Sequence, residues 1–85
     1  MRFREYDVVR VIAPIPDARI HGNAGEGVQP QVGDIGAILI IHPVKPDEEA
    51  AFIVESTDPG GSTLWMADIF ASESEQVPLD GQSGT

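Results

Sequence analysis

The chain has 85 residues, enough for one small domain, and 41% of them are hydrophobic. It contains no cysteine, which excludes disulfides, thiolate metal sites and cysteine nucleophiles. The formal net charge is -9, from 5 basic and 14 acidic residues, so the composition favours basic partners and disfavours nucleic acid and anionic lipid.

The hydropathy pattern gives no sign of a membrane segment. No apolar run approaches the roughly 20 residues that a membrane helix needs. Residues 1–7 lack the long apolar centre and the small-residue cleavage site of a signal peptide. We therefore expect a cytoplasmic protein that makes no contact with a membrane.

The first predicted strand covers residues 7–12, a run rich in β-branched side chains. Pro14 and Pro16 end it, because proline cannot donate a hydrogen bond to a sheet. A long connection follows over residues 14–31, in which residues 18–21 could form a short extended piece. Loops of this length are uncommon in compact domains and are often functional.

Two glycines introduce the second predicted strand, residues 36–41. Gly33 and Gly36 predict a tight turn and a close approach of two backbones, since glycine has no Cβ. Simple alternation would place Ile38 and Ile40 on one face of this strand. The other face would carry Ala37, Leu39 and Ile41. Both faces are apolar, as in a strand buried on both sides.

A hairpin is predicted in the second half of the chain. Residues 50–56 and 62–67 form two strand-like runs, and Asp58-Pro59-Gly60-Gly61 between them is a strong turn signal. The two runs should pair antiparallel.

The last segment predicts a helical turn and a short edge strand. Asp68 can cap a turn that runs to Ala71, and residues 76–79 read as a closing strand limited by Pro78. We expect one domain over residues 1–79 and a disordered tail over residues 80–85. Four or five short strands indicate an all-β fold, a small antiparallel barrel with one long loop. The alternative is an α+β domain with a helix over residues 66–75, which the weak helix formers Ser72 and Ser74 disfavour.

Three short motifs resemble a bacterial family of very small SH3-like barrel proteins of unknown function. They are Phe3-x-Glu5-Tyr6-Asp7-Val8-Val9, Val32-Gly33-Asp34-Ile35-Gly36-Ala37-Ile38, and Ala51-Phe52-Ile53-Val54-Glu55 followed by Gly61-Ser62-Thr63-Leu64. The Gly-Asp-x-Gly piece also resembles KOW-type barrels of ribosomal and transcription proteins. The order of elements is distantly similar to the SH3-like domain of the nitrile hydratase β subunit. The resemblance implies an SH3-like barrel, and it supplies no catalytic residues.

Residues with catalytic or cofactor-binding potential are sparse. The loop glycines meet neither the Rossmann spacing nor the P-loop pattern, and no nucleophile elbow is present, so we expect neither a cofactor nor an enzyme. His21 and His42 are the only imidazoles, and they lie far apart without ligand spacing. We expect two surface histidines without a role. If a metal is bound, His21 with Glu26 and Asp34 is the better candidate.

Trp65 is the most informative single side chain for binding. It could fill the core, or it could anchor a partner, because tryptophan is enriched at interface hot spots. Met66 and Leu64 lie on the opposite face of the same strand, so one apolar face must be exposed or covered by another segment. The long connection or the Ile69–Phe70 turn could supply that cover, and the sequence leaves both readings open.

The favoured hypothesis is a non-catalytic binding module for a protein partner or a second copy of the chain. The chain would act as an accessory subunit of a larger enzyme, or it would neutralise a basic protein. Its site would consist of an apolar centre and an acidic rim: Trp65, Met66 and Ile69, with Asp47, Glu48, Glu49 and Asp68. The acidic run 47–49 otherwise reads as a solvated turn.

Two alternatives remain open at this point. A KOW-like nucleic-acid-associated protein would use a basic patch of four arginines: Arg2, Arg4, Arg10 and Arg19. The overall acidity argues against it, because phosphate contacts dominate such affinity. A small metal- or ligand-binding protein would use His21 and the long connection.

Overall fold

The computed structural model describes residues 3–21, 29–43 and 45–78. Five strands and two 3-10 turns follow one another in the chain: β1 (Val8–Val11), η1 (Asp17–Arg19), β2 (Ile35–His42), β3 (Ala51–Thr57), β4 (Thr63–Phe70), η3 (Ala71–Glu73) and β5 (Ser74–Gln76). The prediction of an all-β fold is confirmed. No helix among these residues is long and apolar enough to cross a membrane.

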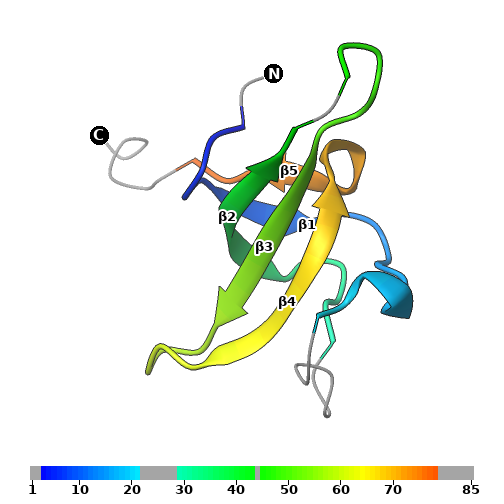
Figure 1. Cartoon of the computed structure of the whole chain (residues 1–85). Coiled ribbons are helices and arrows are strands. Elements are labelled where there is room, and N and C mark those ends of the chain that lie inside the picture. The colour runs from blue at the N-terminus through cyan, green and yellow to red at the C-terminus, as the bar shows by residue number, and fades with distance from the viewer. Residues whose placement is uncertain (1–2, 22–28, 44, 79–85) are drawn as a thin grey trace.

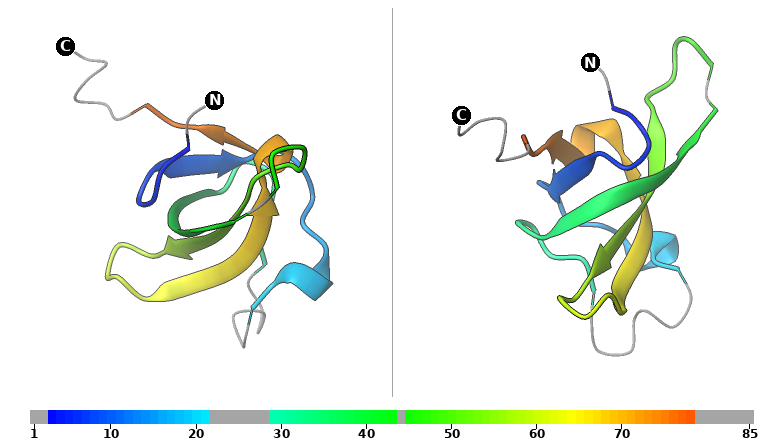
Figure 2. Two further views of the ribbon diagram at one scale, coloured as in Figure 1. Left: turned by 45° about the horizontal axis from the view of Figure 1, so that its top comes forward. Right: turned by 90° about the vertical axis from the view of Figure 1, so that its left-hand side faces the viewer.

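The five strands form one antiparallel sheet in the order β4-β3-β2-β1-β5. Strands β1 to β4 pair with their neighbours in sequence, and β5 returns to the free side of β1. The sheet is strongly curled, as the two views of Figure 2 show. Its edge strands are β4 and β5, and the sheet is not closed into a barrel.

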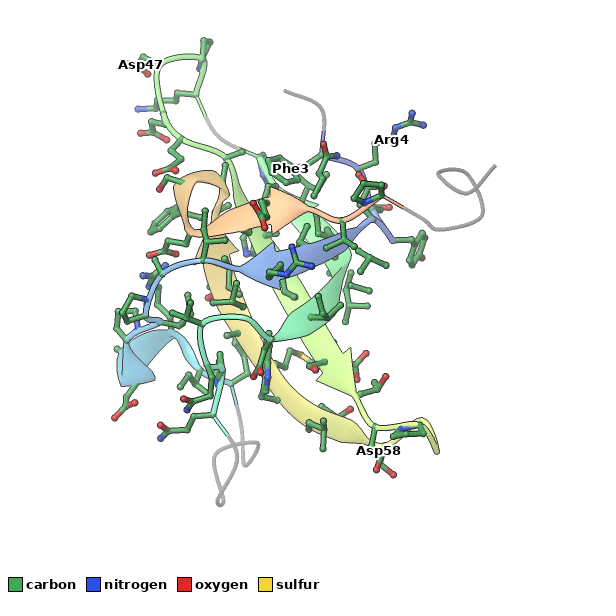
Figure 3. The ribbon with its side chains drawn as sticks, turned by 180° about the vertical axis from the view of Figure 1, so that it is seen from behind. Phe3, Arg4, Asp47 and Asp58 are labelled. Carbon is green, nitrogen blue, oxygen red and sulfur yellow. The ribbon has the colours of Figure 1, made fainter. Side chains whose placement is uncertain are left out.

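The core lies on the inner side of the curled sheet. In Figure 1 β2, β3 and β4 stand in front of β1 and β5, and in Figure 3, seen from behind, the order is reversed. Every strand from β1 to β4 contributes buried side chains, the largest of which are Trp65 and Phe52. Phe3 packs on this core, with its ring centroid 4.7 Å from that of Phe52.

A β-bulge changes which side chains of β2 point inward. Ile38 pairs with Val54 and Ile40 pairs with Ile53, so Leu39 is an extra residue on β2. After the bulge Ile41 packs against the core, whereas Ile40 is 49% exposed. The expectation that Ile38 and Ile40 share a face is therefore wrong, because one inserted residue reverses a period-2 pattern.

The two predicted glycine roles are confirmed. Gly33 has a φ of 100°, which favours glycine, at the turn before β2. Gly36 is buried in β2, where a Cβ would lie 2.7 Å from Val54 Cγ1 and 2.9 Å from the Glu55 carbonyl oxygen. The close backbone approach at Gly36 therefore requires the absence of a side chain.

The end of the described chain differs from the prediction in two ways. Strand β4 continues to Phe70, so Asp68 does not cap a helical turn, and the 3-10 turn begins only at Ala71. An α+β domain with a helix over residues 66–75 is also wrong. The last strand spans Ser74–Gln76, earlier than residues 76–79. The predicted tail 80–85 lies outside the described residues, as do residues 22–28 of the long connection.

Candidate interaction face

The structure places Trp65 and Ile69 in the core. Trp65 is 1% exposed and Ile69 is fully buried, and both point inward from β4. The Trp65 indole Nε1 donates a hydrogen bond of 3.1 Å to Asp34 Oδ2, which also accepts the Gln31 N–H at 3.0 Å. The expectation that these two side chains form an exposed apolar centre is therefore wrong, because alternation along β4 turns them away from the surface.

The opposite side of β2, β3 and β4 forms what we call the outer face. It is defined here by eight outward-pointing side chains of these three strands: Ala37, Ile40, His42, Ala51, Ile53, Glu55, Met66 and Asp68. Two of the predicted site residues, Met66 and Asp68, belong to it. This face is turned toward the viewer in Figure 1.

The apolar part of the outer face is a contiguous group on adjacent strands. Ile40 pairs with Ile53 across β2 and β3, and Met66 lies diagonally across from Ile53 on β4. An open hollow of about 380 Å³ lies toward β1 and is lined by Val8, Ile35, Gly36, Ala37, Glu55 and Thr57. The bulge at Leu39 is what brings Ile40 to this surface.

The charged side chains of the outer face are both acidic. Glu55 accepts a hydrogen bond from the Thr63 hydroxyl, and Asp68 lies at the end nearer His42. The outer face is therefore an apolar patch with carboxylates beside it, on a chain whose net charge is -9.

The predicted acidic turn lies at one end of the molecule. Figure 3 shows Asp47 and Asp58 at opposite ends, on the β2–β3 and β3–β4 connections. Asp47 and Glu48 are exposed, as expected for a solvated turn. The Glu49 carboxylate accepts a hydrogen bond from the Ser72 N–H, so it links this turn to η3.

Both histidines of the chain meet at Asp68. His42 Nε2 and His21 Nε2 each lie 3.2 Å from Asp68 Oδ1. The three side chains are between 37% and 39% exposed, so the cluster is open to solvent. The sequence predicts two surface histidines far apart in the chain, and they meet because β2 and β4 lie on either side of β3.

His21 reaches Asp68 because the segment after η1 runs along the open edge of β4. Ile20 forms a β-bridge with Ala67, and the His21 N–H donates to the Met66 carbonyl at 2.7 Å. These contacts place His21 beside Asp68, the next outward-pointing residue of β4. The predicted extended piece at residues 18–21 is thus confirmed only at its end, since Asp17–Arg19 is a 3-10 turn.

Arg19 holds the same segment in place through contacts with Glu73 and Phe70. Its Nη1 and Nη2 donate to the two Glu73 carboxylate oxygens at 2.8 and 2.7 Å, and its guanidinium lies 4.7 Å from the centroid of the Phe70 ring. The hydrogen bonds to Glu73 raise the pKa of Arg19, and those from Arg19 lower the pKa of Glu73. η1 is therefore fixed to η3 by a bidentate ion pair.

The protonation of the imidazole nitrogens follows from Asp68. An ionised carboxylate only accepts hydrogen bonds, so the His42 nitrogen that bonds to it must carry a hydrogen. At 3.2 Å the facing His21 nitrogen must do the same, because otherwise two lone pairs would face each other. Within the described ranges, no set of three or more histidine and carboxylate side chains is placed to hold a metal ion.

Several described residues of the two alternative sites have partners elsewhere in the structure. Asp34 bonds to Trp65 and Gln31 and does not join His21, and Glu26 lies outside the described residues. Of the predicted basic patch, Arg10 is paired with Glu75 at 2.7 Å and Arg19 with Glu73. Arg2 lies outside the described residues.

Sequence reasoning missed the His21–Asp68–His42 cluster and the bond between Asp34 and Trp65. The partners in each are far apart in the chain and meet only through strand pairing. The one available signal was that the chain has just two histidines and that neither occupies a predicted strand interior. Comparisons with known protein families, with curated proteins and with solved structures found no significant match.

Proposed function

We propose that this chain is a non-catalytic binding module that docks a basic protein partner on its outer face. Ile40 carries the proposal. It lies in the second half of β2, paired with Ile53 on β3, and is 49% exposed. Apolar side chains that gather on an exposed sheet face favour an interaction site over a purely solvated surface.

The charge of the surroundings supports a basic rather than an acidic partner. Asp68 and Glu55 belong to the outer face, and the chain has 14 acidic residues against 5 basic ones. Complementary charge steers association and rejects partners of the same sign. A basic protein that buries an apolar side chain in the hollow beside Ala37 would satisfy both features.

We also propose that the curled sheet is an incomplete SH3-like barrel, open between its edge strands β4 and β5. Its connectivity supports this, because the last strand returns to pair with the first and the sheet is strongly curled. Both features bring the two ends of a short sheet toward each other. Long-range nuclear Overhauser contacts between β4 and β5 would support closure, and their absence would leave an open sheet.

A pull-down from native lysate tests the binding proposal. The tagged chain is compared with Ile40→Thr, which keeps a β-branched side chain but removes apolar surface from the outer face. The matched control is Ile12→Thr, because Ile12 is 44% exposed but lies just beyond β1. Each pull-down is run with and without nuclease, and circular dichroism checks the fold of each variant.

The expected result is a stoichiometric basic protein that the wild type and Ile12→Thr retain. Ile40→Thr should lose at least about tenfold in affinity, as for a residue near the centre of an interface. Capture that disappears with nuclease would instead support a nucleic-acid partner. Equal capture by both variants would place the contact elsewhere, and an empty column with a dimeric chain would indicate self-association.

A further inference from the structure

The two histidines of the chain converge on a single carboxylate oxygen. His21 and His42 come from opposite sides of β4, one from the segment after η1 and one from the end of β2, and both reach Asp68 Oδ1 at 3.2 Å. Histidine is the side chain that ordinarily gains a proton between pH 5 and 8, and this chain has no cysteine to share that range. Its proton-binding capacity in this range is therefore concentrated at one end of the outer face.

We propose that protonation of His21 and His42 controls docking on the outer face, so that a basic partner is held at neutral pH and released on acidification. This inference rests on the proposed function. With both imidazoles neutral, the three side chains together carry one negative charge, from Asp68. With both protonated, they carry one positive charge, and they then repel a lysine or arginine of the partner.

The other charged groups around the cluster do not supply the same response. They are Arg19 of η1, Glu49 of the turn before β3 and Glu73 of η3. Both glutamates interact electrostatically with Arg19, and so does Asp68. Strand β3 lies between β2 and β4 and contributes Ala51 and Ile53 there. Neither side chain carries a titratable group. Guanidinium and carboxyl groups as classes ordinarily change charge outside pH 5.5–8. The imidazoles are therefore the groups that can change the sign of this region in that range.

Two measurements test the proposal. The first uses a blocked decapeptide of alternating leucine and lysine, whose charge is constant in this range, and determines its dissociation constant at pH 8.0 and 5.5. EDTA is present so that trace metal cannot compete with protons. Wild type is compared with the double variant His21→Gln and His42→Gln, in which neutral amides replace the imidazoles and can still donate to Asp68.

The second measurement follows the imidazole Cε1–H resonances by NMR as the pH is changed. The resonances show whether each imidazole gains a proton between pH 8.0 and pH 5.5, the range over which the peptide affinity is compared. His21 is followed in the variant His42→Gln, and His42 is followed in the variant His21→Gln. This measurement does not depend on the peptide.

The expected result is a dissociation constant about tenfold higher at pH 5.5 than at pH 8.0 for the wild type. The double variant should show a ratio near one, and in the wild type the loss of affinity should follow the protonation of the imidazoles. Imidazoles that keep one protonation state from pH 8.0 to pH 5.5, or an equal pH ratio in wild type and double variant, would overturn the inference while leaving the proposed function in place. A peptide that does not bind at pH 8.0, or that binds equally well to Ile40→Thr, would overturn the basic-partner function and with it this regulation.

Discussion

The indole N–H of Trp65 donates a 3.1 Å hydrogen bond to Asp34 and so joins the largest core side chain to the turn that begins β2. The same carboxylate oxygen accepts the Gln31 N–H, so Asp34 satisfies a buried donor and closes a turn at once. A tryptophan in a core usually needs such a partner for its nitrogen.

Replacing Asp34 should therefore destabilise the fold. Asp34→Ala leaves the indole N–H and the Gln31 N–H without their acceptor, which costs about 1–3 kcal/mol of unfolding free energy. Urea unfolding followed by tryptophan fluorescence measures the loss. An unchanged midpoint would show that solvent replaces this acceptor without cost.

Truncating Trp65 itself should unfold much of the population. Trp65→Ala removes a side chain that is 1% exposed, at a cost of about 3–5 kcal/mol, a large share of the stability of a small domain. The neighbouring Leu64→Ala is the control, because Leu64 is 36% exposed. A folded Trp65→Ala protein that lost only partner binding would contradict the burial of this residue.

The Arg19–Glu73 ion pair should make stability depend on acid. The pKa of Glu73 is held below its ordinary value near 4.5 by the hydrogen bonds from Arg19. A group with a lowered pKa in the folded state stabilises the fold above its unfolded-state pKa, and the contribution is lost as the pH falls through the folded-state pKa. The unfolding free energy should therefore fall as the pH decreases below about 4.5.

The variant Glu73→Gln should remove about 1–3 kcal/mol at neutral pH and flatten this part of the pH profile. Glu75→Gln is the matched control, because the Arg10–Glu75 pair has the same 2.7 Å contact with side chains that are 42% and 50% exposed. Exposed pairs contribute about 0–1 kcal/mol. Equal losses in the two variants would show that burial does not distinguish the pairs.

Gly36 should not tolerate even the smallest side chain. In Gly36→Ala the new Cβ would meet Val54 Cγ1 at 2.7 Å and the Glu55 carbonyl oxygen at 2.9 Å, so β2 and β3 would have to separate. We expect a loss of about 1–3 kcal/mol, typical of overpacking. Gly60→Ala should change the stability by less than about 0.5 kcal/mol, since its nearest contact would be Asp58 Oδ1 at 3.5 Å. Thermal unfolding of both variants decides between these expectations.

Local sequence signals predicted the strands well where period and turn chemistry agree. The predicted run at residues 50–56 and the Asp58–Gly61 turn indicated the β3–β4 hairpin, and Gly33 and Gly36 indicated the entry to β2. Asp68 was misassigned because an acidic residue before apolar ones resembles a helix cap. Pairing with Ile53 keeps it in the strand, so tertiary context overrides the local preference.

The candidate site was less accessible from sequence, for a geometric reason. One bulged residue at Leu39 decides whether Ile40 or Ile41 faces solvent, and a bulge is a property of two paired strands. The meeting of His21, His42 and Asp68 likewise depends on three segments that only the sheet brings together. The strand that holds Trp65 has two apolar faces, so its pattern does not decide which face is buried. The acceptor of the indole N–H, Asp34, lies in the distant turn before β2.

The Ile20–Ala67 bridge has a consequence for association between molecules. β4 is an edge strand, and an edge strand with free backbone groups can template further strands from other chains. The segment after η1 occupies the middle of that edge at Met66 and Ala67, held there by Arg19. We therefore expect that loss of the Arg19–Glu73 pair in acid uncovers this edge and promotes fibre-like assembly before global unfolding.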